Sequence, residues 1–256
     1  LLLLTLGFAY RLALNIVQYR SAGNPIPENV ADVYDAETYG TWRRYCAENC
    51  RLSILASILS FLANLMLLVS NAYAAFASLF GTGSMQLLAV ILLDSLVGFL
   101  VGVGVDYYRV MVIEEKYGFN RSTLNTFVTD QLRNLVLGTL VSLGLAHVLL
   151  RLHTALGDRM ILLFAAVVFV ISLSMSFLYP LFSRMGNKFV PLEEGELKDK
   201  LMALLTKHGY QVKAIEVMDA SRRTTKLNAY FTGFGRLKTI VLYDNLVNAM
   251  SAEEIC

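Results

Sequence analysis

The chain has 256 residues, of which 56% are hydrophobic and only 16% charged, and its formal net charge is +2. Soluble globular proteins carry about 25% charged residues, so this composition indicates a membrane protein. The small net charge does not indicate a nucleic-acid partner, and 3 cysteines in a chain of this length do not predict a disulfide framework.

Apolar stretches approach the length of about 20 residues that a helix needs to cross a bilayer. We predict five membrane helices, over residues 1–17, 53–80, 87–113, 135–150 and 160–178, the last closed by Tyr179 and Pro180. The predicted fold is therefore a mainly α-helical polytopic membrane region over residues 1–182, followed by the start of an α+β domain over residues 183–256. Because the first residue, Leu1, falls inside an apolar run, we interpret the sequence as an internal fragment.

The charges of the loops predict the orientation of these helices. Lys and Arg gather between the first and second segments, between the third and fourth, and after the fifth, whereas residues 81–86 contain neither. Basic loops stay on the cytoplasmic side of the membrane. We therefore expect the α+β region on the cytoplasmic side, in a bacterial inner membrane or, in a eukaryote, in the endoplasmic reticulum.

Several polar residues in or near the predicted spans have two interpretations. Ionisable groups within membrane helices usually face a bundle interior or water, so Asp94 is a candidate for a wet interior, whereas Asp106 can lie at the interface. His147 fits an interface position better than a metal ligand. Cys46 and Cys50 share a helix face at i, i+4 spacing, but we interpret them as free thiols because a metal site needs more ligands nearby.

Two stretches predicted on the cytoplasmic side contain sequence patterns that a simple loop does not need. Helical spacing over residues 32–51 interleaves charges with Tyr34, Tyr39, Trp42 and Tyr45, which fits an interfacial aromatic belt or a wall along a substrate path. Residues 113–123 leave a membrane helix with two acids and turn at Gly118, and Ser122 or Thr123 would cap the next helix. This second stretch fits a polar hairpin or a functional element equally well.

The α+β region begins with an amphipathic helix over residues 196–208 that Gly209 ends. Strands are predicted over residues 211–218, 227–231 and 239–243, with Gly233 and Gly235 in the turn between the last two. Another helix opens at Ser251, where Glu254 has the spacing of a capping box.

Four stretches in this order resemble the type I CAAX prenyl endopeptidases, a family of integral-membrane zinc metalloproteases. They are Glu114–Arg121 with Thr123 and Asp130; Pro180–Phe182 leading to Pro191–Leu197; Ser221–Arg223 with Asn228–Tyr230 and Gly233; and Ile240–Asp244 ending in Glu253–Ile255. Each stretch is weak alone, but the four with matching gaps cover nearly the whole chain. The resemblance implies a zincin-like metalloprotease domain after the membrane helices.

The resemblance also implies a zinc cofactor and a hydrolytic reaction. The family pattern continues into a helix with the motif H-E-x-x-H, whose two His bind zinc and whose Glu acts as general base. This motif and the zinc ligands are expected beyond Cys256, so catalytic and metal-ligating residues are expected to be absent from this chain, and the fragment alone is expected to be inactive. The expected substrates are peptides or membrane-associated proteins, with or without a C-terminal prenyl group.

One substrate-binding element is expected within the chain. In zinc peptidases of this kind, a strand with the pattern Asn-Ala-aromatic lies along the cleft and pairs with an extended substrate, and the matching residues are Asn228, Ala229 and Tyr230. The alternative is that Asn228 caps a turn and Tyr230 packs in the core. The family often has a Ser-His pair and a Ser before the Asn, where this chain has Thr225, Lys226 and Leu227, so the substrate preference stays open.

The members of the family enclose a water-filled chamber between seven membrane helices, five of which would lie in this chain. A bacterial source would favour membrane-protein quality control over prenylated substrates. The alternative function is a non-catalytic polytopic membrane protein: a degenerate relative, a scaffold or a transporter. Transporters usually carry inverted repeats with paired broken helices, and we find no such pairing in the sequence.

Overall fold

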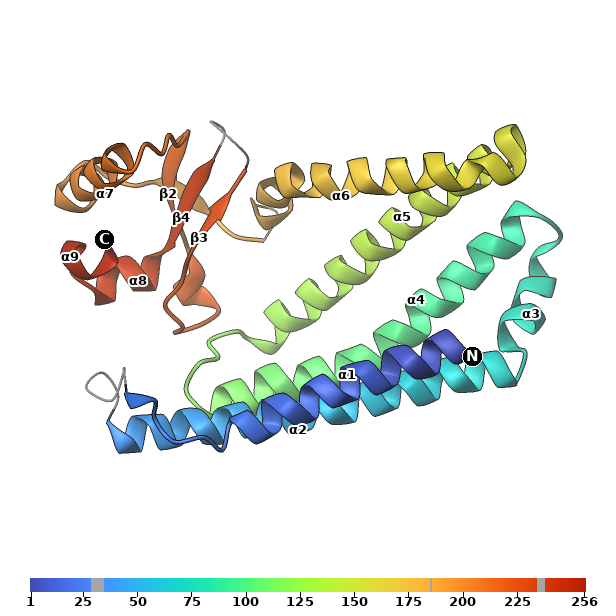
Figure 1. Cartoon of the computed structure of the whole chain (residues 1–256), viewed down its shortest axis with the longest axis horizontal. Helices are drawn as coiled ribbons and strands as arrows, with labels where there is room; N and C mark the ends of the chain where they lie inside the picture. The colour runs from blue at the N-terminus through green and yellow to red at the C-terminus, as the bar shows by residue number, and fades with distance from the viewer. Residues whose placement is uncertain (29–34, 185, 234–237) are drawn as a thin grey trace. The chain divides into compact units, whose positions relative to one another are not determined.

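The computed structural model describes the chain except residues 29–34, 185 and 234–237, and the side chains of residues 158 and 175–183. The chain forms two compact units (Figure 1). The first unit comprises residues 1–117 and 127–150, and the second comprises residues 118–126 and 151–256. The predicted domain boundary at residue 182 and the predicted limits of the membrane spans stay predictions.

The first unit is helical. Its elements are α1 (Leu2–Ser21), α2 (Ala36–Val69), α3 (Ala72–Ala77), the 3-10 helix η2 (Ser78–Phe80), α4 (Ser84–Tyr107), the π-helix η3 (Tyr108–Glu114) and most of α5 (Leu124–Leu156). Within the described residues, four helices are long and apolar enough to cross a membrane: α1, α2, α4 continued by η3, and α5. Helix α1 lies alongside α2 (Figure 1).

In two places the structure has one continuous helix where the sequence predicts two separate helical segments. The helical spacing of residues 32–51 belongs to α2, which Asp35 caps by accepting hydrogen bonds from the backbone N–H groups of Glu37 and Thr38. No Gly or Pro occurs over residues 41–69, so nothing in the local chemistry interrupts this helix. Thr123 caps α5, as predicted, and the helix continues without a break to Leu156.

The second predicted membrane segment, residues 53–80, extends beyond the C-terminal end of α2. Helix α2 stops at Val69, and Asn71 has a φ of 54°, a left-handed conformation that Asn tolerates better than most residues. The remaining apolar residues form α3 and η2. Hydrophobicity continues across this turn, which is why the sequence pattern does not show it.

The second unit contains a long apolar helix and a small mixed α/β layer. Its elements are η4 (Gly157–Arg159), α6 (Met160–Arg184), β1 (Phe189–Pro191), α7 (Glu196–Lys207), β2 (Ala214–Met218), η5 (Ala220–Arg222), β3 (Ala229–Thr232), β4 (Thr239–Tyr243), α8 (Asp244–Ala249) and α9 (Ala252–Ile255). The backbone of α6 stays helical past Pro180, so this proline does not end the helix. In its fully described part, Met160–Ser174 is a shorter apolar helix.

The strands form one sheet in the order β1-β2-β4-β3. Strands β2 and β4 are parallel, and the two outer strands, β1 and β3, are antiparallel to their neighbours. The sequence analysis missed β1, because Pro191 argues against a central strand. In the structure β1 is an edge strand, a position that tolerates Pro because half of the backbone N–H groups need no partner.

Most of the residues predicted to end or begin helices and strands in the second unit are found at those positions. Gly209 follows α7 with a φ of 69°, and Gly233 follows β3 with a φ of 84°. Ser251 and Glu254 form the predicted capping box at α9, and their hydrogen bonds hold the pKa of the Glu254 carboxyl below its usual value. Gly235, the second predicted turn residue, lies outside the described residues.

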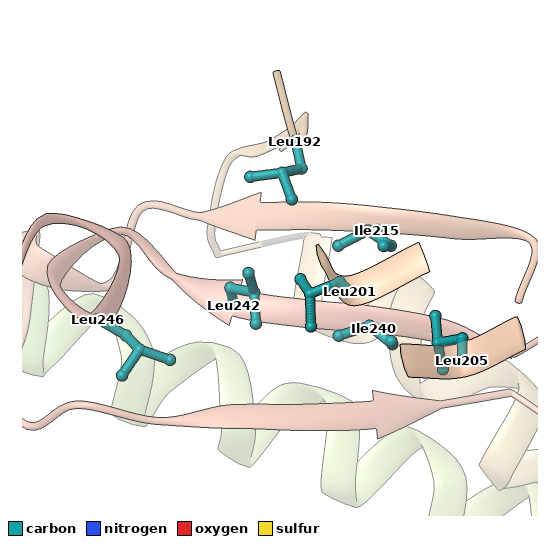
Figure 2. Close-up of a cluster of buried hydrophobic side chains, with 7 residues drawn as sticks. All are labelled: Leu192, Leu201, Leu205, Ile215, Ile240, Leu242 and Leu246. Carbon is teal, nitrogen blue, oxygen red and sulfur yellow. The ribbon is translucent and has the colours of Figure 1, made fainter. Parts of the chain in front are cut away.

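The core of the second unit lies between the sheet and the helices α7 and α8 (Figure 2). Leu201 and Leu205 of α7 pack with Ile240 and Leu242 of β4, and Leu246 of α8 joins the same cluster. Leu242 is 2% exposed and Val241, on the opposite face, is 1% exposed. Strand β4 is therefore buried on both faces, which explains its continuous apolar sequence.

Two neighbouring residues of α7 provide a test of this packing. Leu201 is 6% exposed and Met202 is 45% exposed. Leu201→Ala should destabilise the second unit by about 2–5 kcal/mol because it leaves a cavity against β4. Met202→Ala should change the stability by less than about 0.5 kcal/mol. Hydrogen-exchange protection of the β4 amides in the purified protein measures both changes, and equal losses for the two variants would contradict this core.

Candidate functional site

The predicted strand with Asn228, Ala229 and Tyr230 lies at an edge of the sheet in the second unit. Among the described strands, β3 pairs with β4 alone, with Ala229 opposite Leu242 and Tyr230 opposite Val241. Asn228 lies just before the strand, and its carbonyl accepts a hydrogen bond of 3.0 Å from the Tyr243 N–H. The structure thus brings the three residues together along one edge.

The hydrogen-bond pattern decides which backbone groups face the free edge. Residues of an antiparallel pair alternate between exchanging hydrogen bonds and pointing these groups away. Asn228 bonds to Tyr243, so the next residue, Ala229, directs its N–H and C=O groups away from β4. Phe231 has the same orientation two residues later. These groups provide the donors and acceptors that an added strand requires.

The three side chains have different surroundings. Asn228 and Ala229 are exposed, whereas Tyr230 is half-buried. The Oδ1 atom of Asn228 accepts a hydrogen bond of 2.9 Å from the Ala229 N–H, so this side chain covers the edge donor. Tyr230 packs against Met218 and Val241, and its ring meets that of Tyr243 edge-on. Tyr230 therefore fixes the strand to the sheet, and Asn228 and Ala229 form its accessible part.

The chain that leads into β3 is held by the segment after Gly118. Asn120 and Thr224 form an antiparallel bridge. The N–H of Arg121 donates to the Arg223 carbonyl at 2.9 Å, and the N–H of Thr225 donates to the Phe119 carbonyl at 3.1 Å. The predicted turn at Gly118 is present with a φ of 71°, and the carbonyl of Gly118 accepts a bond from the Thr225 hydroxyl at 2.8 Å.

A second anchor comes from α8, which the sequence analysis missed. The side-chain amide of Asn245 donates to the carbonyls of Thr224 and Lys226 at 3.1 and 2.9 Å. The preceding residue, Asp244, accepts hydrogen bonds from the backbone N–H and the hydroxyl of Ser221. A polar pair, Asp-Asn, directly after a buried strand was the available signal for these contacts.

The stretch Glu114–Arg121 is one of the motifs that carry the family resemblance, and its first half makes its contacts within the first unit. Tyr45 donates a hydrogen bond of 2.5 Å to Glu114. Lys116 forms an ion pair with Glu48, and the Tyr117 hydroxyl donates to Glu48 at 3.1 Å. The hydrogen bond to Glu48 raises the pKa of Lys116. The boundary between the units, at residues 117 and 118, thus falls inside the motif.

The first unit also contains a large cavity between α2 and the α4–η3 helix. Its volume is about 1130 Å³. Most of its lining is aliphatic, and its polar residues are Glu48, Arg51, Tyr108 and Lys116. Leu52, Val105 and Ile113 pack together as a buried cluster beside it. A cavity with this lining can hold a long hydrocarbon chain with a polar end.

The polar residues predicted in the spans have identified partners in the first unit. Asp94 accepts a hydrogen bond of 2.8 Å from the Tyr73 hydroxyl, and it lines a small cavity of about 100 Å³ with Ser60 and Asn64. Asp106 lies 3.3 Å from Arg109 and from Gln131. That Asp94 faces water stays a prediction.

The described residues do not provide a ligand set for a metal ion. Cys46 and Cys50 are free thiols, half-buried and buried, and His147 is exposed on α5. In the described part of the chain, no group of three or more His, Cys, Asp and Glu side chains can hold a metal. The described residues therefore do not fit a zinc site by themselves.

Comparisons with known proteins agree with this arrangement. The family model described as the CAAX prenyl protease N-terminal region, with five membrane helices, matches residues 15–184. The model of peptidase family M48 matches residues 191–256. The five-helix description agrees with the number of spans predicted from the sequence.

Individual relatives extend the comparison over nearly the whole chain. The chain is 30% identical to CAAX prenyl protease 1 of Saccharomyces cerevisiae over 97% of its own length and 58% of the relative. It is 29% identical to the human CAAX prenyl protease 1 homolog over 88% of its length and 50% of the relative. The crystal structure of S. mikatae Ste24p is similar with a TM-score of 0.86 and 28% identity, over 98% of this chain and 62% of that one. The chain thus spans about half the length of these relatives.

A pair of asparagines on α8 tests the anchoring of the edge strand. Asn245→Ala removes two hydrogen bonds to the carbonyls of residues 224 and 226 and should destabilise this segment locally by roughly 1–3 kcal/mol. Hydrogen exchange of residues 224–229 should become faster. Asn248→Ala, at an exposed position on the same helix, is the matched control. Unchanged protection in the Asn245 variant would show that α8 does not hold this segment.

Proposed function

Because this chain belongs to the CAAX prenyl proteases of peptidase family M48, we propose that the whole protein is an integral-membrane zinc metalloendopeptidase that cleaves prenylated or membrane-associated peptides. The observation that carries the proposal is β3, an edge strand whose exposed Ala229 directs its N–H and C=O groups away from β4. In this proposal β3 binds the substrate, and the rest of the whole protein supplies the zinc ligands.

An extended peptide can add to β3 as a further strand. Its backbone would exchange hydrogen bonds with the N–H and C=O groups of Ala229. The Ala229 N–H, which donates to the Asn228 side chain at 2.9 Å, would donate to a substrate carbonyl instead. The absence of a bulky side chain at Ala229 lets the two backbones approach. Such pairing holds the substrate straight and makes few demands on its side chains.

The membrane part of the chain supports a lipidated substrate. The cavity of about 1130 Å³ has an aliphatic lining and carries Arg51, Lys116 and Glu48 among its polar residues. An isoprenoid chain would lie along the aliphatic residues, with the polar end of the substrate near these charges. In the second unit, the apolar helix α6 lies close to β3, so the proposed peptide site is near a membrane-associated element.

In the whole protein, a bound zinc ion would supply the hydrolytic chemistry that the described residues do not supply. The described residues contribute to the earlier step, in which the peptide is bound and oriented. The second unit, with β3, is proposed to lie on the cytoplasmic side, because the basic loops of the sequence favour that orientation.

Metal content and cleavage of the whole protein test the enzymatic proposal. The protein purified from its native membrane should contain about one zinc ion per chain, and it should cleave a farnesylated peptide with a free C-terminus. Removal of zinc by a chelator should abolish cleavage, and added zinc should restore it. A zinc-free native protein that cleaves no peptide would instead favour a non-catalytic membrane protein.

A backbone N-methyl scan of the substrate tests pairing with β3. Methylation of a substrate amide that bonds to β3 should lower kcat/KM by about 10-fold, because it removes a hydrogen bond and adds bulk. Methylation of the next amide, which points away from β3, is the matched control and should have little effect. The expected result is an alternation with a period of two residues. A uniform effect along the peptide would contradict strand addition.

A further inference from the structure

The large cavity between α2 and the α4–η3 helix has charges at one end and hydrocarbon along the rest. Its charged lining residues are Glu48, Arg51 and Lys116, and the ion pair between Lys116 and Glu48 places the charges of both helices at the same end. The lining of α2 beyond Arg51 is aliphatic: Leu52, Leu55, Leu59 and Ala63. A molecule that fits this cavity therefore has a polar head and an apolar body.

The apolar part of the cavity has about the length of one leaflet of a bilayer. From Arg51 to Ala63 a helix rises by about 18 Å, and one leaflet contributes about 15 Å to the hydrocarbon core. Both helices that line the cavity are long and apolar enough to cross a membrane. The charged end of the cavity therefore corresponds to the depth of lipid headgroups, and its apolar end to the depth at which acyl chains finish.

The volume of the cavity exceeds what a single isoprenoid chain needs. The volume of about 1130 Å³ lies above the range of roughly 300–1,000 Å³ that is usual for drug-sized ligands. A farnesyl group has fewer atoms than most such ligands and would leave much of the cavity open. A phospholipid with two acyl chains is an occupant of more suitable size.

The charged end of the cavity has one positive charge in excess. The ammonium group of Lys116 pairs with the Glu48 carboxylate, which also accepts from the Tyr117 hydroxyl at 3.1 Å. Arg51 is hydrogen-bonded to the neutral Tyr19 hydroxyl instead, and within the described part of the chain it forms no ion pair. Glu48, one turn earlier on α2, acts on Arg51 only at longer range. Two cations and one anion leave a net positive charge, which a single phosphate group would balance.

Tyr19 of α1 holds the guanidinium group of Arg51 in place. The Nη2 and Nε atoms of Arg51 donate to the Tyr19 hydroxyl at 2.9 and 3.3 Å, and the guanidinium carbon lies 5.5 Å from the centre of the Tyr19 ring. A guanidinium group has five N–H donors, so these two bonds leave the donors on Nη1 for another acceptor. Arg51 is exposed, and its planar fork suits the paired oxygens of a phosphate group.

We propose that this cavity binds one anionic phospholipid from the surrounding bilayer, with the phosphate on Arg51 and the acyl chains along α2 toward Ala63. Basic pockets between membrane helices are a known means of recognising anionic headgroups. The Glu48 carboxylate is engaged by Lys116 and Tyr117, so it is not offered to the ammonium group of a zwitterionic headgroup. The site therefore favours an anionic lipid over a zwitterionic one.

The phospholipid and the isoprenoid chain of the proposed function would occupy the same space. The phospholipid would fill the cavity in the resting protein and would leave when a prenylated peptide enters. A filled aliphatic cavity keeps the packing contacts that an empty one loses. Binding of the phospholipid does not require cleavage of any peptide, so this site stands or falls separately from the proposed function.

The headgroup is tested with dioleoyl-phosphatidylglycerol and dioleoyl-phosphatidylcholine, which have the same acyl chains but differ in charge. Each lipid is titrated into the delipidated whole protein in detergent, and binding is measured by native mass spectrometry. The wild type should bind one phosphatidylglycerol about 10-fold more tightly than phosphatidylcholine. Arg51→Met should reduce this ratio to about 1, and Arg51→Lys should keep part of it. Arg20→Met, at an exposed position on α1, is the matched control and should behave like the wild type.

The acyl chains are tested by filling the cavity without changing its charge. Gly104 lines the cavity, and a Cβ atom built there would have no contact within 4 Å. Gly104→Leu should therefore weaken the binding of both lipids by about 10-fold or more, because its side chain takes the place of several methylene groups. Gly102→Leu, on the same helix but beside a different cavity, is the matched control and should leave lipid binding unchanged.

The outcomes separate the phospholipid site from the proposed function. Equal binding of the two lipids by the wild type overturns the site, whether or not the Arg51 variants fold. Lipid binding that Gly104→Leu leaves unchanged also overturns it, because the chains then lie elsewhere. A farnesylated peptide tests the isoprenoid in parallel: if it binds without displacing phosphatidylglycerol, the isoprenoid lies elsewhere and the phospholipid site stands. If the peptide binds and neither lipid does, the cavity serves the substrate alone and the phospholipid site is wrong.

Discussion

The second unit depends on β4 being buried on both faces. Leu242 and Ile240 pack under α7 and α8, while Val241 packs with Met218 on the opposite face. A strand in this position must pair on both sides, because an unpaired buried backbone group costs free energy. Strand β2 pairs on one side and β3 on the other. The second side of β3 is left as an edge, and the candidate site is a consequence of this arrangement.

Free edges invite pairing with other chains, and proteins limit this risk by keeping them short or covered. Strand β3 has both features: it spans Ala229–Thr232, and the Asn228 side chain accepts from the edge N–H of Ala229. The segment that precedes β3 is hydrogen-bonded to residues 119–121 and to the side chain of Asn245. An edge that is fixed in place but covered only by a side chain can accept a substrate strand with little rearrangement.

The motif that runs from Glu114 to Arg121 has contacts in both units. Glu114, Lys116 and Tyr117 bind residues of α2 in the first unit. Phe119 and Arg121 bind the segment before β3 in the second unit. A substitution in this motif is therefore expected to affect both the membrane helices and the loop that precedes the edge strand, although the motif itself need not contact substrate.

The sequence by itself determined the elements whose signals are local. Hydrophobic length predicted the membrane helices, capping residues predicted the starts of α5 at Thr123 and of α9 at Ser251, and a β-branched run predicted β4. Only the tertiary structure decided that α2 runs without interruption from Ala36 to Val69, that Phe189–Pro191 is a strand, and that Lys226 stacks on Phe119. The last two features depend on partners far along the chain: Pro191 is acceptable only at an edge, and the Lys226–Phe119 contact joins residues more than a hundred positions apart in the sequence. Periodicity and capping report on neighbours within a turn or a strand, so they do not carry this information.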